Sequence, residues 1–390
     1  MHYVTAGESH GPCLTAIVSD VPAGLRVSEK DIDADLQRRQ SGYGRGGRQR
    51  IESDHARVLS GLRFGVTLGT PISIQVVNAD WRNWQDRMAA FGSRPDDLVR
   101  EVTPRPGHAD LVGALKNNTD DCRDVLERAS ARETAARVAA AGIAREFLAD
   151  LGVDIRSYVT RIGSAAYHEE NPMMQAPDYS PLDIEMSDVR CPDAAASDAM
   201  RKAIDAARDQ GESLGGTFRV VVTGLVEGLG DFDAGPNRLT GQLASAVFSI
   251  PAIKGVEFGL GFAAAARGGS EVHDPITRTD KDGFSRATNN AGGLEGGMST
   301  GMPLIITAAM KPIPTLAHPL ATINMDTMEP AEASRERSDV CAVPACAVVA
   351  EAEVAFVIAE AYMRKFGHDN MVDIKSALQD YRLRIHTQSR

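Results

Sequence analysis

Residues 28–50, SEKDIDADLQRRQSGYGRGGRQR, decide against the most common nucleotide-binding fold. Ser28 followed three residues later by Asp31 is typical of a helix start, and the apolar spacing behind them carries that helix into a pair of arginines. The glycines that begin at Gly42 have the G-x-G-x-x-G spacing of a dinucleotide-binding loop, which requires a strand before it. Here the glycines follow a helix. We therefore exclude a Rossmann fold.

The second half of this segment indicates a binding site for an anion. Residues 38–50 contain five arginines, four glycines and no acidic residue, although the chain has a formal net charge of −11. Arginine presents a fixed fork of donors to phosphate or carboxylate, and glycine lets backbone N–H groups approach the same oxygens. The alternative is a solvated basic loop, which is the usual structure of an isolated charged run.

The composition predicts a folded cytoplasmic protein. At 390 residues, 43% hydrophobic and 24% charged, the chain is long enough for one large domain or two. The first residues, MHYVTAGESHG, lack the features of a signal peptide, and no stretch approaches the roughly 20 apolar residues of a membrane span. We expect no membrane partner.

Cysteine usage and charge exclude further classes. Five cysteines without a C-x-x-C pair predict reduced thiols that serve packing, and neither a disulfide framework nor a structural zinc site. The sequence pI near 5.4 argues against a nucleic-acid partner, because a basic domain is the usual footprint of such binding.

Strand-like and helix-like segments alternate along the chain. The expected strands, which are apolar or β-branched runs, are Leu14–Val21, Pro71–Asn78, Thr217–Glu227, Gly255–Phe262 and Met302–Met310. The expected helices, several of them ended by a glycine, are Ser28–Gln40, Ala131–Leu151, Asp198–Gln210, Arg238–Phe248 and Ala347–Phe366. Residues 167–193, rich in proline, acids and methionine, are expected to connect two sheet-containing halves across the surface.

Two motifs invite specific chemistries that we reject. The adjacent pair Ser9-His10 could be taken for a serine hydrolase, but adjacent side chains seldom face each other and the chain has no G-x-S-x-G elbow. Glu271-x-His273-Asp274 could be taken for a metal cluster, yet it lacks a helical H-E-x-x-H frame and a thiolate partner. We expect no metal site.

Several polar, glycine- or proline-punctuated motifs, each weak alone, become specific in combination. In chain order they are TAGESHG from residue 5, RRQSGYGRGGR from residue 38, PRPGHAD from residue 104, ERASARET from residue 127, AGGLEGG from residue 291, KPIPT from residue 311 and RSDVCAVP from residue 337. This order resembles the chorismate synthase family along nearly the whole chain. The departures are Ser41, where the family usually has glycine, and the alanine run 263–266.

The resemblance implies a fold and a reaction. The fold is α+β, a single large domain over residues 1–390 built as a β-α-β sandwich with helices between sheets, and four copies form a homotetramer. The reaction is an anti 1,4-elimination of phosphate and a ring hydrogen from 5-enolpyruvylshikimate 3-phosphate to give chorismate, with reduced FMN required although nothing is oxidised overall. The chain has no long insertion for a flavin reductase, and a weak NADPH-dependent flavin reductase activity, with NADP as its nucleotide, stays open.

The resemblance also implies roles for individual residues. His10 is expected to protonate the departing phosphate, His108 to serve reduced flavin at its pyrimidine edge, and Asp339 to help take the ring proton. Ser338 is expected to assist Asp339, whose alternative role is to cap the helix that begins near Val343. The expected substrate-binding residues are arginines: Arg39, Arg45, Arg48, Arg105, Arg132 and Arg337. The expected flavin-binding residues are Arg128, Ala129, Ser130, Pro251, Ala252, Gly296, Lys311, Pro312, Ile313, Pro314, Thr315 and Arg337.

Two expectations follow from the chemistry. The substrate carries several negative charges, and so many buried arginines should coexist only when anions occupy the cleft, because an unpaired buried charge is costly. Rival functions use the same arginines differently: a sugar-phosphate isomerase or phosphotransferase would be indifferent to FMN, and an RNA-binding protein would show steep salt dependence and no turnover.

Overall fold

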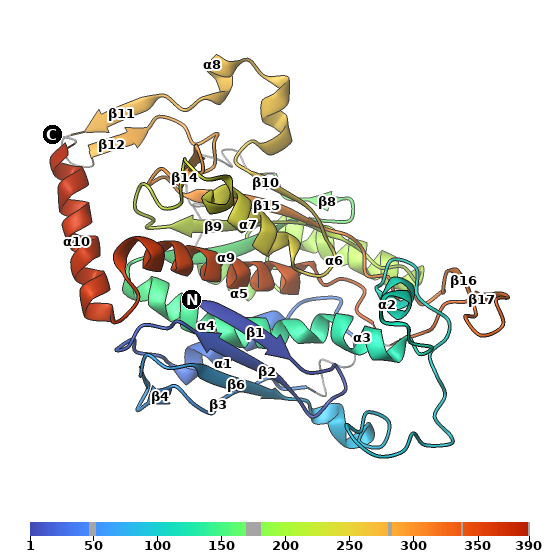
Figure 1. Ribbon diagram of the computed structural model, residues 1–390. Coiled ribbons are helices and arrows are strands. Elements are labelled where there is room, and N and C mark those ends of the chain that lie inside the picture. Colours follow the sequence, from blue (N-terminus) through green and yellow to red (C-terminus); the bar gives the residue numbers. More distant parts are fainter. Residues whose placement is uncertain (47–51, 169–180, 280–282, 337, 389–390) are drawn as a thin grey trace.

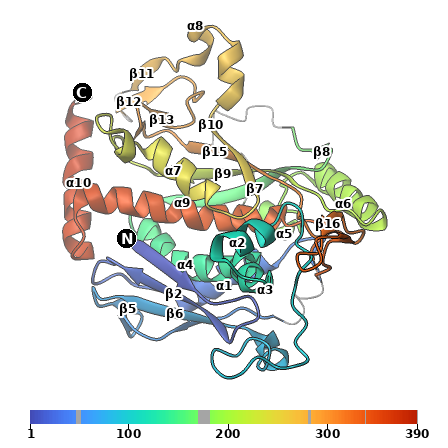
Figure 2. The ribbon, with the colours of Figure 1, turned by 45° about the vertical axis from the view of Figure 1, so that its right-hand side comes forward.

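Two antiparallel sheets enclose a layer of helices. The computed structural model describes residues 1–46, 52–168, 181–279, 283–336 and 338–388. The first sheet has the order β1-β2-β6-β3, made by His2–Ala6, Cys13–Ser19, Ile72–Val77 and Ala56–Val58. The second has the order β10-β15-β9-β7-β8, made by Ile253–Phe258, Leu304–Met310, Gly216–Thr223, Asp154–Ile162 and Ala165–Ala166. Figures 1 and 2 show α4 and α9 between these sheets. The predicted α+β sandwich is confirmed.

The central helices are buried because they are apolar on nearly every side. Helix α9, Val343–Phe366, contacts α4 (Thr134–Asp150), α1 (Glu29–Gln40), α7 (Leu239–Phe248) and β7. Its small and β-branched side chains fill the space between the sheets, as expected for a helix that is hydrophobic all round. Each sheet turns alternate side chains toward this layer; in β2 these are Leu14, Ala16 and Val18.

The remaining elements surround the sandwich. Helices are α2 (Asp110–Asn117), α3 (Arg123–Ala129), α5 (Pro181–Met186), α6 (Ala194–Asp209), α8 (Gly269–Val272) and α10 (Met371–Gln388). Short 3-10 helices are η2 (Ala79–Asn83), η3 (Ala131–Glu133), η4 (Gly235–Asn237) and η5 (Gly261–Ala266). Two-stranded pairs are β4 (Leu62–Arg63) with β5 (Val66–Thr67), β11 (Ile276–Thr279) with β12 (Gly283–Arg286), β13 (Leu294–Glu295) with β14 (Met298–Ser299), and β16 (Ala321–Ile323) with β17 (Pro330–Glu332). Among the described residues, no helix is long and apolar enough to cross a bilayer.

The expected connection at residues 167–193 is wrong as a link between sheets. Residues 169–180 lie outside the described residues, but β8 before them and β9 after them belong to the same sheet. Proline and acidic residues mark a surface segment and do not say which strands it joins. The chain instead passes from the first sheet to the second between β6 and β7, through α2, α3 and α4.

A buried carboxylate ties the layers of the sandwich together. Glu351 on α9 is 1% exposed. It accepts hydrogen bonds from Arg38 on α1 at 2.8 Å, Arg145 on α4 at 2.9 Å, Ser157 on β7 at 2.6 Å and Arg190 at 3.5 Å. Burial raises the pKa of the Glu351 carboxyl, but the nearby guanidinium groups outweigh burial and lower it to about 2.

Glu351→Ala is expected to lower the free energy of unfolding by about 3–5 kcal/mol, because it leaves buried guanidinium groups without their shared carboxylate. The measurement is urea unfolding. The lowered pKa means that the wild-type carboxylate stabilises the fold above about pH 4.5 and that this contribution is lost as the pH falls toward 2. Glu185→Ala is the control, since Glu185 bonds Arg38 and Arg190 from the surface and should cost less than about 1 kcal/mol. Equal losses would contradict a special role for Glu351.

Candidate active site

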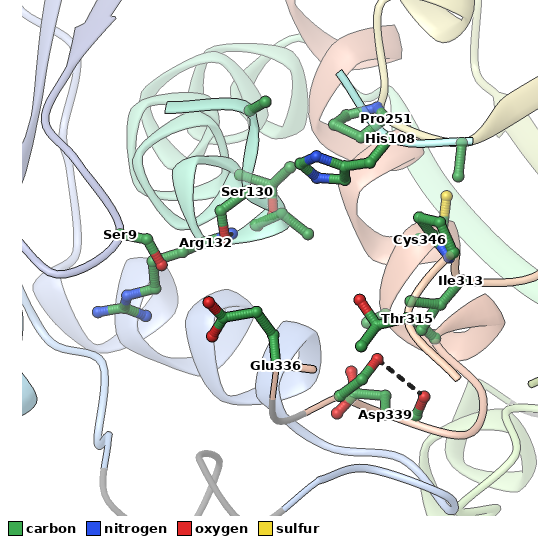
Figure 3. A pocket seen from close by; sticks show the side chains of 18 of the residues that line it. Ser9, His108, Ser130, Arg132, Pro251, Ile313, Thr315, Glu336, Asp339 and Cys346 are labelled. Atoms are coloured by element: carbon green, nitrogen blue, oxygen red, sulfur yellow. Dashed lines mark hydrogen bonds between the residues drawn. The ribbon is translucent and has the colours of Figure 1, made fainter. Parts of the chain in front are cut away.

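One cavity gathers residues from distant parts of the sequence. It has a volume of about 410 Å³ and lies where loops from both sheets meet the ends of α1, α3 and α9 (Figure 3). The predicted site residues that line it are His10, His108, Asp339, Arg39, Arg45, Arg105, Arg132, Ala129, Ser130, Pro251, Ala252, Lys311, Ile313, Pro314 and Thr315. Which of them bind substrate and which bind flavin remains a prediction.

Other predicted residues lie elsewhere. Arg128 turns away, and its guanidinium donates to the carbonyl oxygens of Thr5 at 2.9 Å and Gly7 at 3.3 Å. Pro312 is not among the lining residues of the cavity, and Gly296 occupies the turn between β13 and β14. Arg48 and Arg337 lie outside the described residues.

Asp54 anchors two of the predicted substrate arginines. Its carboxylate accepts from Arg132 at 2.6 and 2.8 Å and from Arg39 at 3.3 Å, and all three side chains are buried. Burial lowers the pKa of the Arg39 guanidinium, and the charge of Asp54 opposes this change. Arg132 also donates to Asn78 at 2.9 Å. Both arginines are therefore fixed at the cavity wall.

Arg45 has a different environment at the end of the glycine-rich segment. Its guanidinium pairs with the Asp339 carboxylate at 2.9 Å, and its side chain is 10% exposed. Within the described part of the chain, Arg45 Nε has no hydrogen-bond acceptor although it is buried. A buried donor without an acceptor at a cavity wall is a group that an anionic ligand could satisfy.

The expectation that the arginines coexist only with bound anions is wrong. Arg39 and Arg132 share Asp54, Arg45 pairs with Asp339, and Arg105 pairs with Asp110 at 2.8 Å. Carboxylates of the chain itself therefore offset the cost of burying these charges.

Two carboxylates hold the two predicted histidines in the same way. The Nδ1 atom of His10 lies 2.8 Å from the Glu127 carboxylate. The Nδ1 atom of His108 hydrogen-bonds the Asp110 carboxylate, which also accepts from Arg105 Nε. Burial raises the pKa of the Asp110 carboxyl, but the hydrogen bonds from His108 and Arg105 hold it well below its usual range. In each pair, Nε2 is left for other partners.

Asp339 does not cap the helix that follows it. Its Oδ1 accepts from the backbone N–H of Gly46 at 2.6 Å and its Oδ2 pairs with Arg45. Ala342 is the N-cap of α9 and makes no side-chain cap bond, so the capping alternative is wrong. Ser338 donates to the backbone carbonyl of Asp339 at 3.2 Å.

The lining of the cavity also includes small side chains. Ala129, Pro251 and Ala252 contribute to it, and Figure 3 places Pro251 beside His108 and away from Asp339. Ala252 has a φ of 71°, which an alanine rarely adopts, and its carbonyl accepts from the backbone N–H of Lys311 at 2.9 Å. Backbone strain of this kind, about 1–3 kcal/mol, gathers at functional sites.

Comparison with known proteins shows the family of the chain. A sequence model of the family described as "Chorismate synthase" matches residues 1–363. The chain belongs to the chorismate synthase family. It is therefore an enzyme of the lyase class.

Individual members of the chorismate synthase family match over their full length. The chain is 48% identical over 388 residues to the chorismate synthase of Geobacter sulfurreducens, and each chain is covered to 98%. It is 49% identical over 386 residues to that of Bacillus subtilis, again with 98% of both covered. A crystal structure of a chorismate synthase superposes with a TM-score of 0.81 at 38% identity, covering 99% of this chain and 98% of that one.

The carboxylates of this chorismate synthase site are what sequence analysis missed. Asp54, Glu127 and Glu336 were not predicted, although Glu127 and Glu336 lie within or beside quoted motifs. A sequence search for an anion-binding site selects cationic residues. The acidic residues that pair with them can come from elsewhere in the chain and are not selected. The available signal was the motif context: Glu127 opens ERASARET, which also supplies Ser130 and Arg132.

Proposed function

We propose that this chorismate synthase converts 5-enolpyruvylshikimate 3-phosphate to chorismate by anti 1,4-elimination, with reduced FMN bound in the cavity of about 410 Å³. The observation that carries the proposal is the pairing, in one cavity, of fixed guanidinium groups with two carboxylate-held imidazoles. Such a site neutralises a phosphate and two carboxylates while offering two positioned proton carriers.

The residues present fit a flavin. Small side chains at Ala129, Pro251 and Ala252 leave room for a flat ring, and Lys311 supplies positive charge. Burial lowers the pKa of the Lys311 ammonium, whose Nζ donates to the Gly107 carbonyl at 2.6 Å. Reduced FMN, when bound, supplies electron density that assists loss of phosphate. We assign the cavity residues Ala129, Ser130, Pro251, Ala252, Lys311, Ile313, Pro314 and Thr315 to flavin binding. Arg128, Pro312 and Gly296, which do not line the cavity, and Arg337, which lies outside the described residues, stay predictions from the sequence.

The chain's own groups divide the remaining work. Arg39, Arg45, Arg105 and Arg132, with Arg48 and Arg337, bind the anionic groups of the substrate and orient them. His10 protonates the departing phosphate through Nε2, because its Nδ1 is already bonded to Glu127. His108 holds the flavin at its pyrimidine edge, and the Asp339 carboxylate helps to accept the ring proton.

We also propose a cytoplasmic homotetramer with a small-molecule substrate. Large apolar side chains at Phe262, Ile276 and Phe284 are exposed between η5 and β12, and exposed apolar surface favours contact with another chain. All five cysteines are free, as is usual in a reducing compartment.

The test of the proposed function is turnover under anaerobic conditions. Protein and 5-enolpyruvylshikimate 3-phosphate are mixed with reduced FMN, oxidised FMN or no flavin, and chorismate is followed by its absorbance. We expect product only with reduced FMN. Chorismate formed equally without flavin would refute the role of FMN, and no chorismate under any condition would refute the elimination and favour an isomerase or a phosphotransferase.

Arg45→Ala is expected to weaken substrate binding by about 10- to 100-fold, which corresponds to roughly 1.5–3 kcal/mol for a lost charge-assisted contact, and to weaken flavin binding less. Fluorescence titration of each ligand measures both affinities. Arg63→Ala is the control, because Arg63 is exposed on β4 and lies over the Phe64 ring. Equal losses of affinity for both ligands would contradict the assignment of Arg45 to substrate.

A further inference from the structure

The segment Ser9–His10 makes three hydrogen bonds to one residue, Glu127. The Glu127 carboxylate accepts from the backbone N–H of His10 at 2.7 Å through Oε2 and lies 2.8 Å from its ring Nδ1 through Oε1. The backbone carbonyl of Glu127 also accepts from the N–H of Ser9 at 3.0 Å. The loop that carries His10 is thus fastened to α3 by both ends of Glu127.

The face of the His10 ring is fixed as well. The Trp84 ring stacks on it with centroids 4.0 Å apart and an interplanar angle of 25°. The Arg123 guanidinium lies 5.3 Å from the Trp84 ring centroid and pairs with Glu127 at 3.2 Å and Glu336 at 2.8 Å. Because one face of the ring is stacked and Nδ1 is bonded, Nε2 is the ring nitrogen left for a ligand.

The charge state of Glu127 decides which nitrogen of His10 carries the proton. Glu127 is 1% exposed; burial raises the pKa of its carboxyl, but the hydrogen bonds from His10 and Arg123 outweigh burial and hold that pKa below its usual value. An ionised carboxylate only accepts hydrogen bonds. His10 Nδ1 must therefore be the protonated nitrogen toward Glu127.

We propose that Glu127 is the positioning residue for His10: its carboxylate keeps the proton on Nδ1, orients Nε2 into the cavity and stabilises the imidazolium form. This rests on the proposed function of His10 as the acid. In the step, the Nε2–H bond breaks, the proton joins an oxygen of the departing phosphate, and the ring becomes neutral with its Nδ1 proton still bonded to Glu127. In many enzyme and metal sites a carboxylate bonded to one ring nitrogen of a histidine orients the other nitrogen toward the ligand.

The groups that face His10 set the sign of the effect. Glu127 favours the imidazolium, while Arg123 on the same helix opposes it and is itself neutralised by Glu336. Arg132 lines the same cavity but is occupied by Asp54. Removing the charge of Glu127 alone takes the negative charge away from Nδ1 and leaves Arg123 charged on the same helix, which disfavours a protonated ring.

Trp84 offers a readout that needs no turnover. The chain has two tryptophans, Trp81 and Trp84, so in a Trp81→Phe background the fluorescence comes from the indole that stacks on His10. A protonated imidazole quenches a stacked indole more than a neutral one. The fluorescence of this background should follow pH with one transition, which His10→Gln should abolish.

In the same background, Glu127→Gln is expected to move that transition to lower pH by about one unit or more, as loss of an opposite charge at hydrogen-bond distance does. Turnover should fall about tenfold or more near pH 8, with its alkaline limb moved in the same direction and the Michaelis constant changed less than about threefold. Glu127→Asp keeps the charge and should restore part of the turnover and part of the pH of the transition. Glu133→Gln, a buried glutamate that pairs with Arg137, is the control and should leave the transition in place.

An unmoved fluorescence transition in a folded Glu127→Gln protein would overturn the proposal. So would equal losses in Glu127→Gln and Glu127→Asp, because they would show that only the shape of Glu127 matters. The fluorescence measurement is made without substrate or flavin, so failure of the proposed function leaves its outcome unchanged. If Glu127→Gln does not fold, Glu127→Asp alone decides: because it keeps the charge, a transition moved to lower pH by about one unit or more contradicts the proposal.

Discussion

His10→Ala is expected to lower the turnover number by about 10²- to 10⁴-fold, the usual contribution of a positioned acid, while reduced FMN still binds. The reason is the proposed role of His10 as the acid: its Nδ1 is bonded to Glu127, and Nε2 is the nitrogen assigned to the departing phosphate. The rate of the variant should also fall less steeply with rising pH than that of the wild type. Stopped-flow turnover over a pH series measures both.

A matched comparison separates the two histidines. His108→Ala should change the absorption spectrum of bound reduced FMN as well as the rate, because His108 is assigned to the flavin. Near-normal turnover in His10→Ala, or a flavin spectrum altered by His10→Ala and not by His108→Ala, would show that the roles are reversed.

Asp339→Asn is expected to slow loss of the ring proton by about 10²-fold or more and to enlarge the deuterium isotope effect at that carbon. An asparagine oxygen can still accept from the Gly46 N–H, which the carboxylate does at 2.6 Å, so the local backbone should be kept. The substitution also removes the charge that pairs with Arg45 at 2.9 Å. Rate measurements with substrate deuterated at that position give the result.

Arg45→Ala is the matched control for this loss of charge. It breaks the same ion pair from the other side and leaves the Asp339 carboxylate in place. We expect Arg45→Ala to weaken substrate binding without enlarging the isotope effect. An isotope effect that grows equally in both variants would assign the effect to the pair and would contradict Asp339 as the group that takes the proton.

Sequence patterns predicted the helices and strands in which one hydrophobic periodicity dominates. The expected strands at Leu14–Val21 and Met302–Met310 correspond to β2 and β15, and the expected helix at Ser28–Gln40 corresponds to α1, with Ser28 as N-cap. Helix α9 begins at Val343, four residues before the expected segment Ala347–Phe366 and at the start assumed in the capping alternative for Asp339, because Pro344 fits the first turn of a helix.

Strand β7, Asp154–Ile162, was missed for a physical reason. Its sequence DIRSYVTRI mixes Arg156 and Arg161 with apolar residues, so it shows neither a continuous apolar run nor a clean alternation. In the sheet it pairs with β9 and covers α9, and Ser157 on its buried face bonds Glu351. Whether such a segment forms a strand depends on its pairing with distant strands and not on its local sequence.

For the site, the sequence predicted the cations and, apart from Asp339, did not predict the carboxylates that pair with them. Arg39 and Arg132 could be selected by residue type, whereas Asp54 and Glu127 gain their meaning only when the fold brings them to those partners. Glu127 also shows that a motif residue can act on another motif far away, since 117 positions separate it from His10. Spacing along the chain carries no such information.

The most direct test of the central claim is the stoichiometry of flavin oxidation under strict exclusion of oxygen. A known small amount of reduced FMN is mixed with the protein and a large excess of 5-enolpyruvylshikimate 3-phosphate, and chorismate and flavin absorbance are followed together. We expect many molecules of chorismate and phosphate for each flavin, with the flavin still reduced at the end. One flavin oxidised for each chorismate formed, or no chorismate at all, would contradict it.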